Sequence, residues 1–248
     1  MRRRTKPAAP RRGRVTSALV LALAELGCAR ATYIELPLPE IAVAVSLQAR
    51  VVPVPRARDR RVAALAQMCP DVGCSRSRLE LDFFSGSPTP NVVCTLPGRR
   101  EKTIVVASHH VLARGGRGLF DAWTSVMLLP ALYASLAQAE REYTFQFIGF
   151  ASSISKGDAS LAWLESEEGR HRNVAAMLWL DFLGLRDVTA WTERSDPNLF
   201  QDFVSAAAAV GVETGGMRLV GAGSIHDQSR AFRWYEIPTI YLHSLDRS

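Results

Sequence analysis

The chain has 248 residues, of which 48% are hydrophobic and 22% are charged. This length allows one large domain or two small ones, and the composition excludes an intrinsically disordered protein. The formal net charge is +6, but residues 1–14 hold seven Lys and Arg residues and no acid, so the remainder of the chain carries −1. The basic charge therefore belongs to the N-terminal tail, and we expect no nucleic-acid partner.

A short apolar run follows the basic tail. Residues 15–24 read VTSALVLALA and lead into a stretch of small residues around Cys28. This order is typical of an export signal, and the run is too short to span a membrane. We expect residues 1–31 to be a tail with a signal-like or anchor segment, and the protein to be exported or membrane-associated through its N-terminus. A disordered tail before a first helix is the alternative.

Residues 32–60 have no clear pattern and lead through the linker-like run VVPVPRARDRR, so we place the main domain at residues 61–248. Three cysteines lie in this domain. Cys69 and Cys74 bracket a short Pro/Gly loop, and in an oxidising compartment they could pair with each other or with Cys94. Free thiols are the alternative. No Cys-x-x-Cys pair is present, which argues against a cysteine zinc site.

Strand and helix patterns alternate along the main domain. The pattern predicts strands at 91–96, 103–108, 143–150, 175–181, 188–192, 217–220 and 238–242. It predicts helices at 62–67, 121–139 with an interruption at Pro130, 158–168 with Asp158 as N-cap, 196–210 with Asp196 as N-cap, and 227–235. This alternation indicates an α/β fold with an open, largely parallel mixed sheet and helices on both faces.

Four side chains suited to a metal ion fall at the ends of these strands or just beyond them. They are His109, Asp121, Asp181 and His243. Imidazole and carboxylate groups are common zinc ligands, and ligands of such sheets bind at the carboxyl ends of the strands. Each residue taken singly also has a structural explanation, such as a helix cap or a hydrogen-bonded histidine.

The local context of these residues resembles a known family. The segments are ASHHV (107–111), GLFD (118–121), LDFLG (180–184), EIP (236–238) and HSLD (243–246). In this order they are similar to the motifs of the co-catalytic zinc aminopeptidases, whose relatives include glutamate carboxypeptidase, the transferrin receptor ectodomain, glutaminyl cyclase, nicastrin and nicalin. The resemblance runs from about residue 60 to residue 246. It implies a three-layer α/β fold and a zinc site that acts on peptide bonds.

The resemblance also implies a role for each ligand. His109 and Asp181 would hold one zinc ion, Asp121 would bridge two ions, and His243 would bind the second. The first site thus keeps three ligands and the second only two, so we expect one ion rather than two.

The catalytic positions depart from the family. The family places a Glu-Glu pair after its Phe-Phe-Gly-Ala strand. The matching stretch here is residues 147–153, and Ala151 and Ser152 occupy the glutamate positions. Alanine cannot accept a proton, and losing a general base typically removes about 10²–10⁴-fold in rate. Val111 replaces the acid that would orient the ligand histidine. Asp158, His226 or Asp227 would have to move in to replace the missing acids.

These departures favour an inactive or weakly active pseudopeptidase that serves as a binding or scaffold domain for a peptide or protein partner. A mononuclear zinc-dependent aminopeptidase or amidase that uses His109, Asp121 and Asp181 is the alternative. A third possibility is an unrelated α/β protein, but the chain has no Gly-x-Ser-x-Gly turn for a serine hydrolase and no phosphate-binding loop. The sequence does not indicate an oligomeric state.

Overall fold

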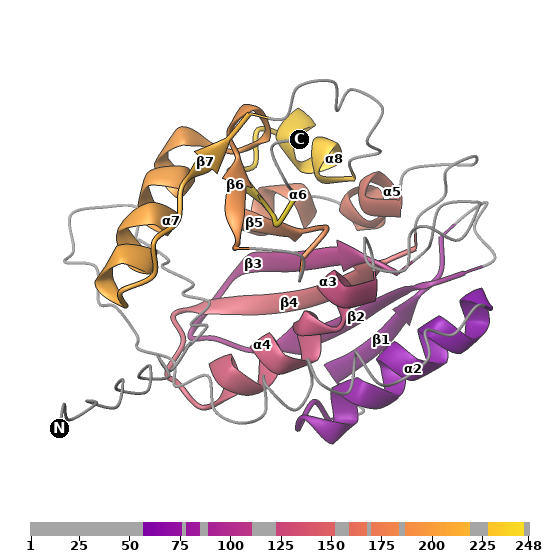
Figure 1. Ribbon diagram of the computed structural model, residues 1–248. Coiled ribbons are helices and arrows are strands. Elements are labelled where there is room, and N and C mark those ends of the chain that lie inside the picture. The colour runs from indigo at the N-terminus through magenta and orange to yellow at the C-terminus, as the bar shows by residue number, and fades with distance from the viewer. Residues whose placement is uncertain are drawn as a thin grey trace, which may run out of the picture.

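The computed structural model describes residues 57–75, 78–84, 89–110, 123–151, 159–167, 170–183, 187–218 and 228–245. They form an eight-stranded sheet with helices on both faces (Figure 1). The strands are β1 (Leu79–Asp82), β2 (Asn91–Leu96), β3 (Arg100–His109), β4 (Tyr143–Phe150), β5 (Val174–Leu180), β6 (Thr189–Trp191), β7 (Gly216–Met217) and β8 (Thr239–His243). Their order across the sheet is β1-β2-β4-β3-β5-β8-β6-β7.

The centre of the sheet is parallel and its margins are mixed. Strands β4, β3, β5 and β8 run in one direction. β2 pairs antiparallel with β4, β1 pairs antiparallel with β2, and β6 pairs antiparallel with β8. The run at residues 103–108 is buried throughout, as expected for a central parallel strand covered on both faces. The predicted largely parallel mixed sheet is therefore confirmed.

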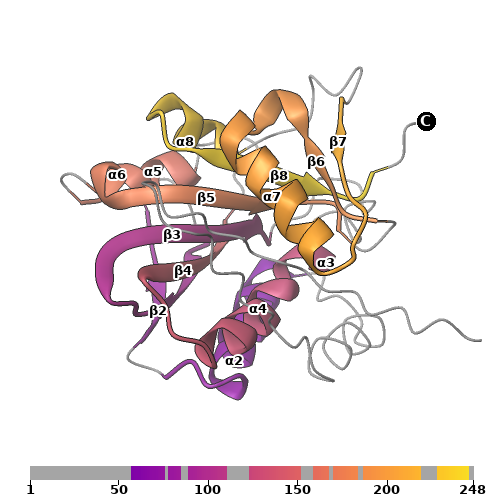
Figure 2. The same cartoon turned by 90° about the vertical axis from the view of Figure 1, so that its left-hand side faces the viewer.

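Helices pack on both faces of the sheet (Figure 2). They are α2 (Arg58–Asp71), α3 (Thr124–Val126), α4 (Leu128–Ala137), α5 (Ala159–Glu165), α6 (Arg170–Asn173), α7 (Pro197–Ala209) and α8 (Ser229–Trp234), with a 3-10 helix η3 (Thr192–Arg194). Alternate strand residues face two separate cores. One core joins Val106 and Phe147 of the sheet to α2, α4 and α7, and the other joins Phe150 and Trp179 to α5 and α8.

Several sequence predictions match the structure closely. The strands at 91–96 and 143–150 have the predicted bounds. Helix α7 begins after Asp196, whose carboxylate accepts hydrogen bonds from the backbone N–H groups of Asn198 and Leu199 at 2.9 and 3.1 Å. This carboxylate satisfies two of the N–H groups that every helix start leaves without an intrahelical partner.

The predicted interruption at Pro130 is wrong. The break lies at Met127, between α3 and α4, and Pro130 is the third residue of α4. Proline is tolerated there because the first N–H groups of a helix have no intrahelical acceptor. Strand β1 and helix α6 were not predicted, since both are short and polar.

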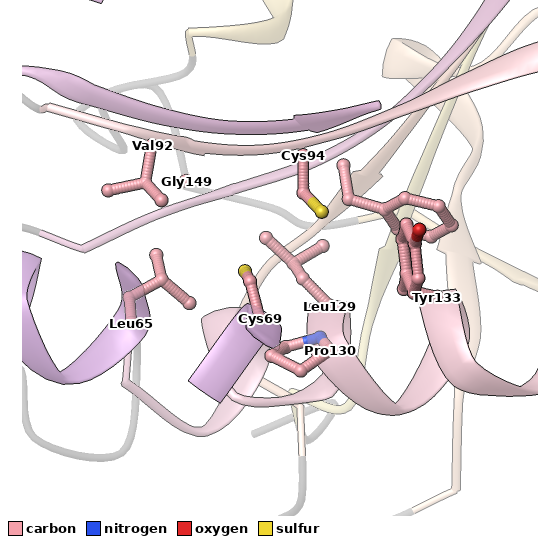
Figure 3. A pocket seen from close by; sticks show the side chains of 9 residues that line it. Leu65, Cys69, Val92, Cys94, Leu129, Pro130, Tyr133 and Gly149 are labelled. Carbon is pink, nitrogen blue, oxygen red and sulfur yellow. The ribbon is translucent and has the colours of Figure 1, made fainter. Parts of the chain in front are cut away.

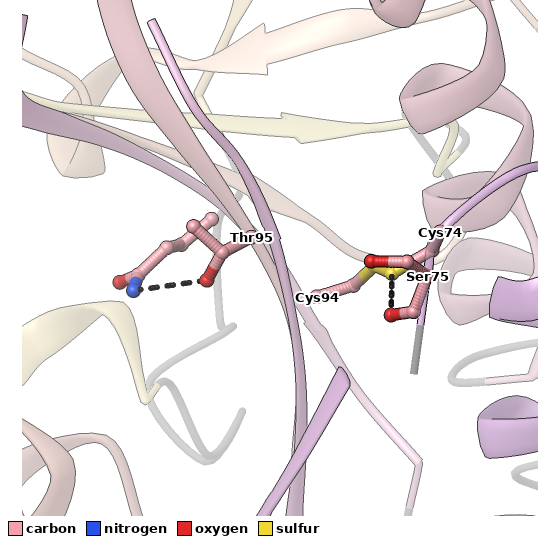
Figure 4. Close-up of a disulfide and its surroundings, with 5 residues drawn as sticks. Cys74, Ser75, Cys94 and Thr95 are labelled. Carbon is pink, nitrogen blue, oxygen red and sulfur yellow. Dashed lines mark hydrogen bonds between the residues drawn. A yellow bond between two sulfur atoms is a disulfide. The ribbon is translucent and has the colours of Figure 1, made fainter. Parts of the chain in front are cut away.

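A disulfide joins Cys74, just after α2, to Cys94 in β2 (Figure 4). It selects one of the pairings that the sequence left open and leaves Cys69 as a buried free thiol. Burial raises the pKa of Cys69 to about 12, because the interior disfavours the charged thiolate. The link ties helix α2 to the sheet, next to the edge strand β1.

A small apolar cavity lies between α2, α4 and the sheet (Figure 3). Its lining includes Leu65, Cys69, Tyr133 and Gly149. Gly149 permits this close packing, since a Cβ atom there would lie 2.4 Å from Leu65 Cδ2. Within the described ranges, no helix combines the length and apolar character needed to cross a bilayer.

Candidate metal and ligand site

Three of the four predicted ligands lie at the ends of adjacent parallel strands. His109 ends β3, Asp181 directly follows β5, and His243 ends β8. β3 pairs with β5 and β5 pairs with β8, so the three strand ends are neighbours. The N–H of Asp181 donates to the carbonyl of Leu242 at 3.0 Å, which extends the ladder to this position. Asp121 lies outside the described residues.

The alternation of side chains along a strand places these three residues on one face of the sheet. Asp181 lies two positions after Trp179, and His243 lies two positions after Tyr241. Trp179 and Tyr241 both belong to the core beneath α5 and α8. Asp181 and His243 are fully buried, whereas His109 is partly exposed.

His109 and Asp181 approach each other closely. His109 Nδ1 lies 3.8 Å from Asp181 Oδ1, which is too long for a hydrogen bond. The imidazole of His109 stacks on the ring of Trp179, with centroids 5.9 Å apart and an interplanar angle of 13°. Packing on Trp179 therefore positions His109, and no direct hydrogen bond joins it to Asp181.

The carboxylate of Asp181 is surrounded by donors. Oδ2 accepts from the Tyr241 hydroxyl at 2.7 Å and from Trp179 Nε1 at 3.4 Å, and Oδ1 accepts from the Phe182 N–H at 3.1 Å. Burial raises the pKa of Asp181, while His109 and the three donors act in the opposite direction and favour the charged form.

The turn after Asp181 is strained and well anchored. Phe182 has φ of 49°, a left-handed conformation that is uncommon for a bulky residue. Its carbonyl accepts from the Ser244 hydroxyl at 2.6 Å, and the N–H of Leu183 donates to Ser125 Oγ at 3.0 Å. The first bond holds the turn after β5 against the segment after β8, and the second holds it against α3. Backbone strain of this kind is often found at functional sites.

His243 has a different environment from His109. Its Nδ1 accepts a hydrogen bond from the backbone N–H of Leu245 at 3.1 Å. Its Nε2 is buried and has no hydrogen-bond partner among the described residues. Burial lowers the pKa of His243 to about 4, so the ring is neutral at pH 7.

The pair of His109 and Asp181 fits one metal ion. Zinc lies about 2.0–2.2 Å from its nitrogen and oxygen ligands, so two atoms on one ion are separated by at most about 4.4 Å. The 3.8 Å between Nδ1 and Oδ1 is within this limit. Within the described residues, no group of three His, Cys, Asp or Glu side chains is close enough to hold an ion. A third ligand such as Asp121 would come from outside this part of the chain.

Ala151 directly follows β4, the strand beside β3. Its side chain is fully buried and belongs to the same aromatic core as Phe150 and Trp163. Its N–H donates to Asn91 Oδ1 at 2.9 Å, and the Asn91 amide donates to Asp82 Oδ2 at 2.8 Å. This chain of hydrogen bonds fixes the end of β4 to β2 and β1. Ser152, Asp158, Val111, His226 and Asp227 lie outside the described residues.

His110 lies apart from this site although it is the next residue after His109. Its Nε2 lies 3.1 Å from the Pro90 carbonyl, and the Arg61 guanidinium donates to the His110 carbonyl at 2.7 Å. Burial lowers the pKa of His110 to about 4. Its Cδ2 lies near Gly149, on the side of α2.

Sequence reasoning missed Tyr241 and Trp179 as partners of Asp181. The signal that could have found them is the spacing of two residues in WLD (179–181) and YLH (241–243). Residues two apart on a strand share a face, so an aromatic side chain there can reach the polar group at the strand end.

Proteins of known structure share this fold at low sequence identity. No family model and no curated protein matches the chain. Among solved structures, glutaminyl cyclase from an Acidobacteriales bacterium has a TM-score of 0.68 at 17% identity, over 90% of this chain and 84% of that one. The LapA aminopeptidase of Legionella pneumophila has a TM-score of 0.64 at 14% identity, over 86% of this chain and 62% of that one. The chain has the fold of the zinc aminopeptidases and glutaminyl cyclases.

A zinc aminopeptidase from Bacillus subtilis, BSAP, also matches, with a TM-score of 0.55 at 12% identity over 64% of this chain and 42% of that one. The chain spans less than two thirds of the aminopeptidases LapA and BSAP but most of the cyclase. The resemblance that the sequence motifs suggested is confirmed as a shared fold. The metal-binding roles of His109, Asp121, Asp181 and His243 stay predictions.

Proposed function

We propose that this chain is a zinc-aminopeptidase-like domain that has lost peptide hydrolysis and acts by binding a peptide or protein partner. One zinc ion held by His109, Asp181 and a further ligand would belong to its binding site. The partner would approach the carboxyl ends of β3, β5 and β8, the neighbouring strand ends that carry the three candidate side chains.

The side chain of Ala151 carries this proposal. The resemblance places a catalytic glutamate at this position, and the methyl group of alanine has no atom that can accept a proton. Ala151 instead packs among Phe150, Trp163 and Trp179, and its backbone is tied to Asn91. A carboxylate introduced into this apolar surrounding would be desolvated and would find no charged partner in the cluster that the described residues form, which is costly. The position is thus suited to packing and not to proton transfer.

The closeness of His109 and Asp181 favours a second candidate, a mononuclear zinc-dependent aminopeptidase or amidase. A zinc ion between the two residues would polarise a carbonyl group or lower the pKa of a bound water. In this case Asp181 would be a ligand supported by Tyr241 and Trp179, and hydrolysis would need no glutamate base.

We further propose that the protein is exported or held at a membrane by its N-terminal segment. The disulfide between Cys74 and Cys94 supports an oxidising compartment, because such bonds rarely persist in the reducing cytosol. The apolar run at residues 15–24 is of the length found in signal peptides.

Metal content and hydrolysis, measured together on the full chain, test the proposed function. We expect about one zinc per chain by mass spectrometry, lost in Asp181→Asn, and no aminopeptidase or amidase turnover that a chelator abolishes. Asp187→Asn, the same change at an exposed acid, should keep the zinc. Turnover that is lost both with chelator and in Asp181→Asn would establish the mononuclear hydrolase instead.

A further inference from the structure

The hydrogen bond from Leu245 determines which nitrogen of His243 carries the proton. A backbone N–H can only donate, so the Nδ1 atom that accepts from it at 3.1 Å must present a lone pair. A neutral imidazole has one donor nitrogen and one acceptor nitrogen. The proton of His243 is therefore on Nε2.

This arrangement does not fit the role of a metal ligand. A protonated nitrogen has no lone pair for an ion, and Nδ1 is already occupied by Leu245. A histidine that binds a metal usually donates its other ring N–H to a carboxylate or carbonyl group. In His243 the other nitrogen, Nδ1, accepts a hydrogen bond instead. Binding an ion through Nε2 would require the proton to lie on Nδ1, where this N–H would point at the N–H of Leu245.

The Nε2–H group is buried and lacks an acceptor among the described residues. Leaving a buried donor unsatisfied is unfavourable, and such a group in a native structure calls for an explanation. The imidazole is positioned by its neighbours, with ring centroids 6.4 Å from both Trp191 and Tyr241. It shares a face with Asp181 at the ends of adjacent strands.

We propose that His243 donates a hydrogen bond from Nε2–H to a carbonyl oxygen of a bound peptide, in place of binding a second metal ion. An uncharged acceptor is favoured because the donor is neutral and an anion would lose its hydration in this buried setting without gaining a charged partner. The inference deepens the proposed function and rests on it for the identity of the ligand.

The tautomer can be observed directly. In the full chain with ¹⁵N-labelled histidine, long-range ¹H–¹⁵N NMR correlations should show a proton on Nε2 of His243. His110 serves as an internal reference, since its Nε2 faces the Pro90 carbonyl and must also carry the proton. A proton on Nδ1 of His243 would overturn the proposal.

Metal stoichiometry provides the second readout. Titration with Zn²⁺ alone should shift the signals of His109 and leave the tautomer of His243 unchanged. Native mass spectrometry should give the same zinc count for the wild type and for His243→Ala. A second zinc ion that is present in the wild type and lost in this variant would show that His243 is a ligand.

Binding of N-acetyl-leucinamide, an uncharged molecule with peptide carbonyl groups, tests the acceptor. We expect His243→Ala to weaken its affinity by up to about tenfold, the effect of one hydrogen bond. His243→Gln, which can place an amide N–H near the same point, should retain more of the affinity. The proposal is overturned if the wild type does not bind this amide or if both variants bind it like the wild type. Hydrolysis of peptides by the wild type would instead contradict the proposed function and leave the tautomer result standing.

Discussion

The hydroxyl of Tyr241 donates to Asp181 Oδ2 at 2.7 Å across two adjacent strands. Both side chains are fully buried. This bond supplies a donor to a carboxyl group that is buried away from water. It is shorter than the bond from Trp179 to the same oxygen. The carboxyl group at the centre of the candidate site is therefore held by a residue that is not itself a candidate ligand.

Removing this hydroxyl should destabilise the protein. For Tyr241→Phe we expect a decrease of about 1–3 kcal/mol in the free energy of unfolding, because the change leaves a buried carboxylate short of a donor. Urea denaturation measures it. Tyr235→Phe is the matched control, since its hydroxyl donates to Glu165 at the surface, and it should lower the stability less than Tyr241→Phe does. If both changes lower the free energy of unfolding equally, burial does not increase the contribution of the Asp181 hydrogen bond to stability.

Restoring a glutamate at the end of β4 should not restore catalysis. In Ala151→Glu the new carboxylate would enter the core beside Phe150 and Trp163, so we expect a loss of several kcal/mol in stability and no chelator-sensitive turnover. Denaturation and an amidase assay measure both effects. Ala151→Gln adds similar volume without charge and should be destabilised less. A stable, active Ala151→Glu variant would mean that this position opens to the substrate.

The disulfide should contribute strongly to stability. Cys74 and Cys94 are separated by 20 residues, and closing a loop of this size is worth about 3 kcal/mol. We expect the Cys74→Ser, Cys94→Ser double variant to lose about this amount in urea denaturation. A reducing agent should lower the stability of the wild type and leave the double variant unchanged. Cys69→Ala should keep the sensitivity to reduction, since Cys69 is outside the bond.

The buried histidines should make stability depend on pH. Folding lowers the pKa of His110 from 6.5 to about 4, so between these values the unfolded chain binds more protons than the folded one. Stability is then full above pH 6.5 and is lost as the pH falls toward 4, by about 3 kcal/mol for this residue. In His110→Gln the loss of stability between pH 6.5 and 4 should be smaller. His243→Gln tests the other histidine with a lowered pKa, and an unchanged profile in both variants would refute this account.

Much of the local structure was readable from the sequence. The strands at 91–96 and 143–150 are apolar, rich in β-branched and aromatic residues, and flanked by turn or charged residues, so their bounds were predicted correctly. Asp196 followed by Pro197 marked the start of α7 for a similarly local reason. The motifs around His109, Asp181 and His243 also identified the correct fold.

The relationships between distant segments were decided only by the tertiary structure. Two histidines adjacent in the chain, His109 and His110, face opposite sides of the sheet, so only the first lies beside Asp181. The sequence contained three cysteines in the domain, but the pairing depended on how α2 packs on β2. The proton position on His243 follows from a hydrogen bond with Leu245 that no motif records. Composition and periodicity report the preferences of neighbouring residues, whereas strand order, burial and hydrogen-bond geometry arise when segments far apart in the chain come together.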